Sequence, residues 1–175
     1  MKLNALMWIP LVVAVIIFCV AAYFTRADVR RVLSALIGGA LGSGIGLLLD
    51  VFGYWVGLWY YLGEHISHGP WLVYVAVAFA QGAVALLGWR LAQRFSVAFV
   101  AFLVFFVAAV LTSQDYLIAN SPFRVQIISP GLAPAIYDLM LWIVVTTVSV
   151  WTLRLLAGTP SPDAGAPSDE KVTAH

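Results

Sequence analysis

Five stretches of this sequence are each long and apolar enough to cross a membrane as a helix. They cover residues 6–24, 32–52, 71–89, 95–111 and 135–156. A crossing helix needs about 20 predominantly apolar residues to span a hydrocarbon core about 30 Å thick. The sequence therefore predicts an all-α integral membrane bundle of five transmembrane helices over residues 1–157.

The composition leads to the same conclusion. Of the 175 residues, 63% are hydrophobic and only 10% are charged, whereas about a quarter of the residues of a soluble domain are charged. A core of this size cannot hold so much apolar surface, so we expect membrane lipid to cover it. Residues 158–175 are polar and rich in Pro and Ala, and we expect a disordered cytoplasmic tail there. The net charge of +1 gives no indication of a nucleic-acid partner.

The distribution of basic residues predicts the orientation. A five-helix topology places seven on one side of the membrane: Arg26, Arg30, Arg31, Arg90, Arg94, Arg154 and Lys171. Only Lys2 and Arg124 fall on the other side. By the positive-inside rule the N-terminus is outside and the C-terminus in the cytoplasm of a plasma membrane. Because arginines follow the first stretch at once, we expect a retained helix rather than a cleaved signal peptide.

The second stretch remains apolar to about residue 62, which is too long for one perpendicular crossing. Two alternatives are open: a single tilted helix, or a break near Gly53 and Gly57 with an interfacial extension to residue 62. The aromatic residues of this extension suit the headgroup region. They are Tyr54, Trp55, Trp59, Tyr60 and Tyr61.

Gly38, Gly42 and Gly46 recur every fourth residue in the second stretch and so follow one helix face. Such a glycine zipper lets another helix approach closely. The partner of this face is either another helix of the same chain or another protomer.

The same topology gathers most polar side chains at the outer face. The candidate site consists of Asp50, Glu64, His65, His68, Asp115, Arg124 and Asp138. We expect Asp115 and Arg124 in a loop over residues 112–134, ordered by turns. Arg124 is then the expected counter-ion of one of the acids. The alternative is that outer loops are polar simply because they contact water.

Two acids have structural explanations as well as functional ones. Asp50 is either an interfacial residue bonded to a tyrosine or a backbone amide, or a binding or catalytic group. Asp138 is expected in the first turn of the fifth helix, where an acid favours the helix dipole, and it shares a leaflet with Asp50. His65 and His68 lack the spacing of a zinc-binding His-Glu-x-x-His motif, so no metal is predicted.

The chain resembles uncharacterised small bacterial multipass membrane proteins. The segments that carry the resemblance are Leu49-Asp50, Gly57-Leu58-Trp59-Tyr60, Gly88-Trp89-Arg90-Leu91-Ala92 and Gln114-Asp115-Tyr116. The resemblance implies no particular activity.

Three functions follow as hypotheses. The first is a non-enzymatic accessory or scaffold subunit that packs through its glycine face on other membrane chains or on itself. The second is an enzyme or binding protein for a lipid-like or isoprenoid-like molecule at the outer leaflet, acting through Asp50 and Asp138. The third is a small ion or proton carrier. No cofactor is predicted, although the second hypothesis implies a bound lipid or isoprenoid.

Overall fold

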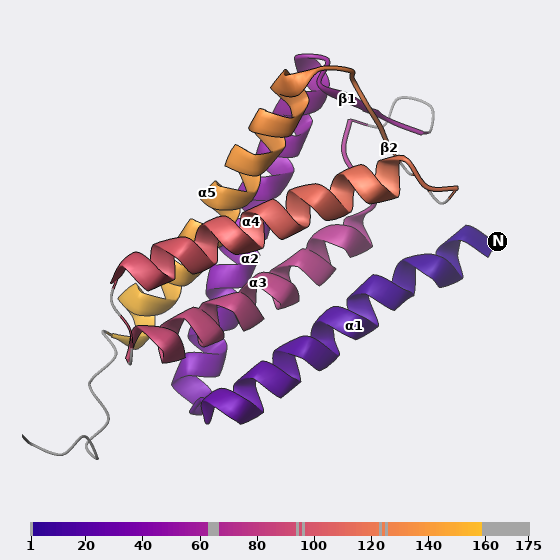
Figure 1. The fold of residues 1–175 in the computed structure, drawn as a ribbon. Coiled ribbons are helices and arrows are strands. Elements are labelled where there is room, and N and C mark those ends of the chain that lie inside the picture. The colour runs from indigo at the N-terminus through magenta and orange to yellow at the C-terminus, as the bar shows by residue number, and fades with distance from the viewer. Residues whose placement is uncertain are drawn as a thin grey trace, which may run out of the picture.

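The computed structural model describes residues 2–62, 67–93, 95, 97–122, 124 and 126–158. Within them lie five helices and two short strands (Figure 1). Their order is α1 (Lys2–Thr25), α2 (Val29–Trp55), β1 (Trp59–Tyr61), α3 (Trp71–Ala92), α4 (Val97–Ala119), β2 (Gln126–Ile128) and α5 (Leu132–Ala157). All five helices are long and apolar enough to cross a membrane. The predicted five-helix membrane bundle is confirmed.

The helices alternate in direction, so the bundle has two distinct ends. At one end β1 pairs antiparallel with β2, with Tyr60 opposite Ile127; we call this the strand end. At the other end the start of α2 meets the end of α5, because Arg30 donates two hydrogen bonds to the Leu156 carbonyl. Arg31 also stacks over the Trp89 ring near the end of α3. We call this the arginine end.

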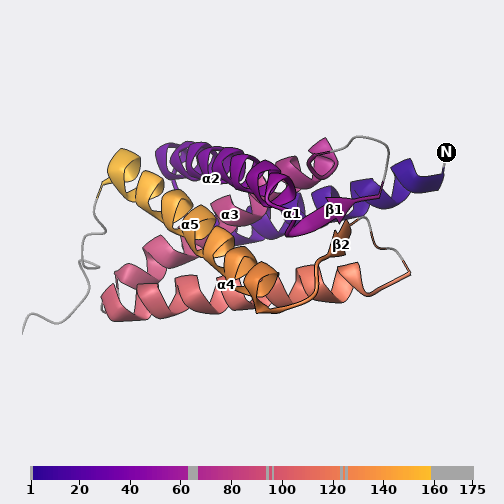
Figure 2. The same ribbon diagram turned by 90° about the horizontal axis from the view of Figure 1, so that it is seen from above.

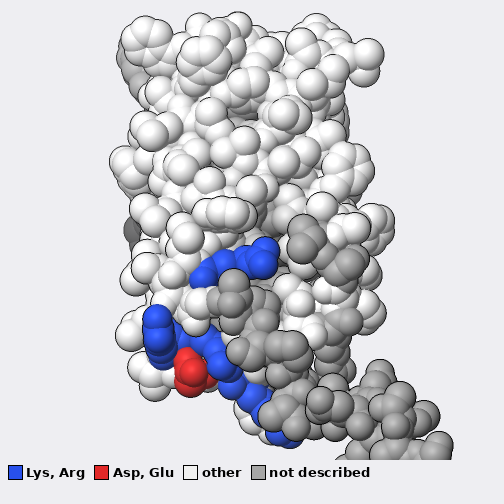
Figure 3. Space-filling model, turned by 90° about the vertical axis from the view of Figure 1, so that its left-hand side faces the viewer, with Lys and Arg blue, Asp and Glu red and all other residues white. Residues whose placement is uncertain are grey.

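Charge is confined to one end of the face seen in Figure 3. Blue side chains gather there with a single red group, and the rest of the described residues on that face are drawn white, without charge. Five arginines of the described residues belong to the turns and helix ends at the arginine end: Arg26, Arg30, Arg31, Arg90 and Arg154. This separation suits a bundle whose uncharged band lies in hydrocarbon.

Helix α2 packs against both α5 and α3 (Figures 1 and 2). A Cβ atom added at Gly42 would lie 2.2 Å from the Ser149 hydroxyl oxygen on α5, and one at Gly39 would lie 2.0 Å from the Ala78 carbonyl oxygen on α3. Glycine is thus required for both close approaches. The face of Gly38, Gly42 and Gly46 packs on α5 of the same chain, which answers the question of its partner.

The second apolar stretch is a helix followed by a strand. Helix α2 ends at Trp55, and Gly57 adopts a φ of +78°, a left-handed conformation that glycine accepts easily. The chain then forms β1 and does not continue as a helix. Of the two alternatives, the break near Gly57 is therefore the one present, and the residues after it form a turn and the strand β1.

Helices α4 and α5 both extend into the segment predicted as a loop. Helix α4 continues to Ala119, because no Gly or Pro interrupts the sequence before Pro122. Helix α5 begins at Leu132, and Pro134 is accommodated in its first turn, where an amide hydrogen has no intrahelical partner. The predicted start at residue 135 is too late. Residues 159–175, which include most of the predicted tail, lie outside the described residues.

Candidate functional site

A cavity of about 450 Å³ lies within the bundle toward the strand end. All five helices and both strands contribute to its wall. Its volume is within the range of ligand pockets, about 300–1,000 Å³. The side chains that line it with hydrogen-bonding groups are Ser43, Asp50, Trp59, Tyr61, Tyr74, Gln114, Asp115, Tyr116, Gln126, Asp138 and Trp142.

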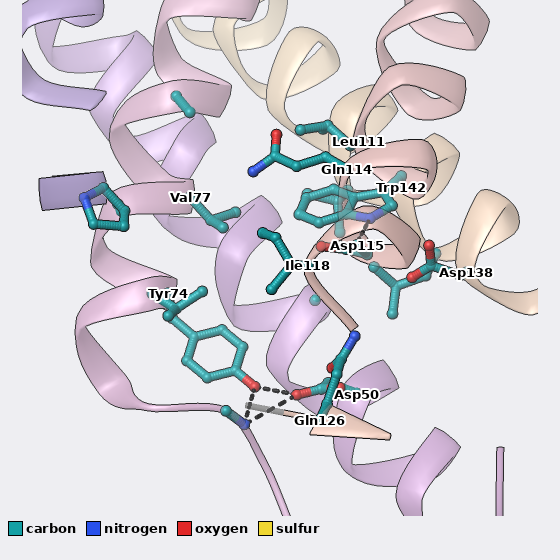
Figure 4. Close-up of a pocket in the computed structure, with 18 of the residues that line it drawn as sticks. Asp50, Tyr74, Val77, Leu111, Gln114, Asp115, Ile118, Gln126, Asp138 and Trp142 are labelled. Atoms are coloured by element: carbon teal, nitrogen blue, oxygen red, sulfur yellow. Dashed lines mark hydrogen bonds between the residues drawn. The ribbon is translucent and has the colours of Figure 1, made fainter. Parts of the chain in front are cut away.

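Three carboxyl groups from three helices line this cavity (Figure 4). Asp50 stands near the end of α2, Asp115 near the end of α4 and Asp138 near the start of α5. Antiparallel helices bring these positions to one level of the bundle. The predicted gathering of acids at one end of the molecule is therefore present for these three residues.

Asp50 is held in place by tyrosines. The Tyr61 hydroxyl donates to both carboxylate oxygens, at 2.6 and 2.7 Å, and the Tyr74 hydroxyl donates to Oδ2. The Gly69 amide approaches the same Oδ2 at 3.4 Å. This is the structural explanation expected for Asp50, a carboxylate bonded to tyrosine and a backbone amide. Burial and the adjacent Asp50 carboxylate raise the pKa of Tyr61, so its hydroxyl remains a donor.

The aromatic cluster fixes the backbone beneath Asp50. The Trp59 indole packs on Gly53, where an added Cβ would lie 2.2 Å from the ring, and donates to the Asp50 carbonyl oxygen at 3.2 Å. Tyr137 on α5 donates to the neighbouring carbonyl of Leu49 at 2.8 Å. Strand β1 and helix α5 together hold this turn of α2 in position.

Asp115 has one hydrogen-bond donor from α5. The Trp142 indole donates to Asp115 Oδ2 at 2.8 Å. The helical continuation of α4 makes this contact possible, because it directs Asp115 inward along the helix instead of leaving it in a loop. The prediction that Asp115 belongs to a loop is wrong for this reason.

Asp138 has the least exposed surface of the three acids, with only 8% of it accessible. It is the seventh residue of α5, and no acid occupies the first turn, so the helix-dipole explanation for Asp138 is wrong. The Thr112 hydroxyl lies beside its carboxyl group, yet neither Asp138 Oδ2 nor Thr112 Oγ1 has a hydrogen-bond partner among the described residues. The buried hydroxyl of Tyr116 is also without one in the described part of the chain.

The other predicted site residues do not join this group. His68 bonds through Nδ1 with the Gly69 carbonyl at 2.6 Å and packs on Trp71. Arg124 is exposed and does not line the cavity. Among the described residues, the ion pair found joins Arg31 and Asp28. Arg124 therefore does not pair with an acid of the cavity in this structure. Glu64 and His65 lie outside the described residues.

Sequence reasoning missed the aromatic partners of the acids. The sequence did not identify Tyr61 and Tyr74 as hydrogen-bond donors to Asp50. It also did not identify Trp142 as the donor to Asp115. Tyr61 is eleven residues from Asp50 and Tyr74 is twenty-four. These separations carry no signal, because a bend after α2 and the start of another helix bring them together. Tyrosine and tryptophan are also common at membrane interfaces for other reasons.

The described wall of the cavity has acids without cations. Of the described residues that line it, none is Lys, Arg or His. The tyrosine and tryptophan donors are largely occupied by Asp50 and Asp115. What the site can offer a further molecule is chiefly the carboxyl group of Asp138 and the hydroxyl of Tyr116, which both line the cavity and have an atom without a partner among the described residues.

Comparisons with known proteins give no family and no function for this chain. No family model matches the chain, and neither a curated protein nor a solved structure matches it.

Proposed function

We propose that this protein binds a lipid-like amphipathic molecule in the cavity at the strand end. The observation that carries the proposal is the cavity itself, whose wall combines three carboxyl groups with apolar side chains (Figure 4). Asp50, Asp115 and Tyr74 are near the helix ends, whereas Val77, Leu111 and Val145 lie further toward the middle of their helices. The lining thus changes from polar near the helix ends to apolar nearer the middle of the bundle. An amphipathic molecule with its head group among the acids and its chain along the apolar wall matches this change.

Burial of the acids also supports a ligand. An ionised or polar group in an apolar environment costs several kcal/mol unless it is paired, and intramembrane acids usually mark a binding or transport function. Asp138 meets that description, because it is 8% exposed and leaves Oδ2 without a partner among the described residues.

The structure removes one of the reasons for the accessory-subunit hypothesis. That hypothesis relied on a glycine face available to a partner, but Gly38, Gly42 and Gly46 contact α5 of the same chain. The orientation that the arginines support is part of the proposal: the arginine end faces the cytoplasm, and the cavity opens toward the outer leaflet of a plasma membrane.

Filling the cavity tests the proposal. Val77 on α3 lines the cavity, whereas Val75 on the same helix is exposed and does not line it. Each is replaced by Trp, and the purified proteins are extracted and their bound amphiphiles identified by mass spectrometry. We expect a molecule at about one per chain in the wild type and in Val75→Trp, and its loss in Val77→Trp. Equal amounts in all three proteins would refute the proposal.

A further inference from the structure

We propose that the head group of the bound molecule is a cation that donates hydrogen bonds, as a protonated amine does. This inference rests on the proposed function and specifies its ligand class. It goes beyond a general lipid-like molecule because it excludes the phosphate head groups that most membrane lipids carry.

The first argument is charge. Asp50, Asp115 and Asp138 line one cavity, and no described lining residue is a cation. An ammonium group supplies the positive charge that such a cavity lacks. A phosphate would add negative charge beside three carboxyl groups, and like charges at close range oppose binding.

The second argument is the balance of donors and acceptors. Tyr61 and Tyr74 already donate to Asp50, and Trp142 already donates to Asp115. Asp138 is more than nine-tenths buried, lines the cavity and has Oδ2 unpartnered among the described residues. A ligand that donates hydrogen bonds satisfies this carboxyl group, whereas a ligand with acceptors alone leaves it unsatisfied.

The third argument is the route of the chain. Several residues that line the cavity are also exposed at the apolar surface, among them Val13 and Ile17 on α1 and Ile118 on α4. The cavity therefore reaches the lipid-facing surface beside these two helices. A single alkyl chain can enter there from the bilayer while the amine stays at the level of the acids.

The experiment uses three probes that differ only in the head group: a primary alkylamine, an alkanol and an alkyl phosphate, each with the same twelve-carbon brominated chain. The full-length protein is reconstituted in phosphatidylcholine nanodiscs at pH 7, where a primary amine is protonated because its pKa is near that of lysine. Bromine quenches tryptophan fluorescence on contact, and Trp59 and Trp142 both line the cavity. Saturable quenching reports occupancy of the site, and a linear increase reports partition into lipid.

We expect the amine to saturate the wild-type protein at a concentration at least about tenfold below that of the alkanol, and the phosphate to show no saturable phase. Asp138→Asn should remove most of this amine preference. Asp28→Asn is the matched control, because Asp28 caps α2 at the arginine end and Asn is an equally good cap; it should retain the preference.

Each contrary result has a distinct meaning. Saturable binding in which the alkanol or the phosphate equals or exceeds the amine overturns the cationic head group and leaves the proposed binding function standing. Retention of the full amine preference by Asp138→Asn also overturns the inference. Absence of saturable quenching by all three probes overturns the binding function and this inference together.

Discussion

Asp50 and Asp138 should respond to the same substitution in opposite ways. Both are acids at the strand end, and both line the cavity, so their positions alone do not distinguish them. Their hydrogen bonds do. Asp50 accepts from two tyrosine hydroxyls, whereas Asp138 Oδ2 accepts nothing from the described residues.

The magnitudes follow from these contacts. A hydrogen bond to a charged group contributes about 1.5–3 kcal/mol. Asp50→Asn replaces one acceptor oxygen by an NH₂ group that faces a hydroxyl donor. The remaining oxygen still accepts a hydrogen bond, but it no longer carries a negative charge. We expect a loss of about 2–4 kcal/mol in the free energy of unfolding. Asp138→Asn removes a buried charge and loses no such bond at Oδ2, so its effect should be between about zero and a gain of 2 kcal/mol.

The assay is reversible unfolding of the delipidated protein in mixed mild-detergent and dodecyl sulfate micelles, followed by tryptophan fluorescence. Removing bound amphiphile matters, because a ligand of the folded state would add its own stabilisation. Asp28→Asn should leave the unfolding free energy nearly unchanged. The reasoning is refuted if Asp138→Asn destabilises the protein as much as Asp50→Asn does, because Asp138 would then be a structural residue.

Two further predictions concern packing and orientation. Gly39→Ala should lower the free energy of unfolding by about 1–3 kcal/mol or more, since its Cβ would meet the Ala78 carbonyl. Gly44→Ala has open space around the new Cβ, and in the same assay its higher helix propensity should raise the free energy of unfolding by up to about 1 kcal/mol. In a Cys19→Ser background, an impermeant maleimide should label Asn120→Cys in intact cells and Val29→Cys only after permeabilisation, because these exposed residues lie at the strand end and the arginine end respectively; the reverse pattern would contradict the proposed orientation.

The sequence was sufficient for the number of spans because length and apolarity dominate in a membrane. A run of about 20 apolar residues has few alternatives to a helix, since unpaired backbone groups in hydrocarbon are too costly. The same reasoning failed at the end of α4. Gln114, Asp115 and Tyr116 are polar, so a hydropathy criterion ends the span before them, yet the backbone stays helical to Ala119. Polarity there marks the face of the helix that lines the cavity and not its end.

The acids of the site could be predicted from topology, whereas their partners could not. Counting helices places Asp50 and Asp138 at one level, and that argument needs no side-chain detail. The bend at Gly57 and the pairing of β1 with β2 are what bring Tyr61 to Asp50. No periodicity encodes such a contact, because it depends on two segments more than sixty residues apart that pair as strands.

The close helix contacts and the cavity are consequences of the same choice of residues. Gly39 and Gly42 allow α2 to approach α3 and α5 closely, so the backbones of these three helices are in contact there. Toward the strand end the facing positions carry large side chains and acids, and the helices enclose a cavity of about 450 Å³ there. Tight packing on one side gives the bundle a rigid frame that can tolerate a polar, incompletely satisfied cavity on the other. Asp50, fully bonded, belongs to that frame. Asp138 lies buried in the cavity wall without a partner for Oδ2 in the described chain, and it is the group on which the proposed ligand depends.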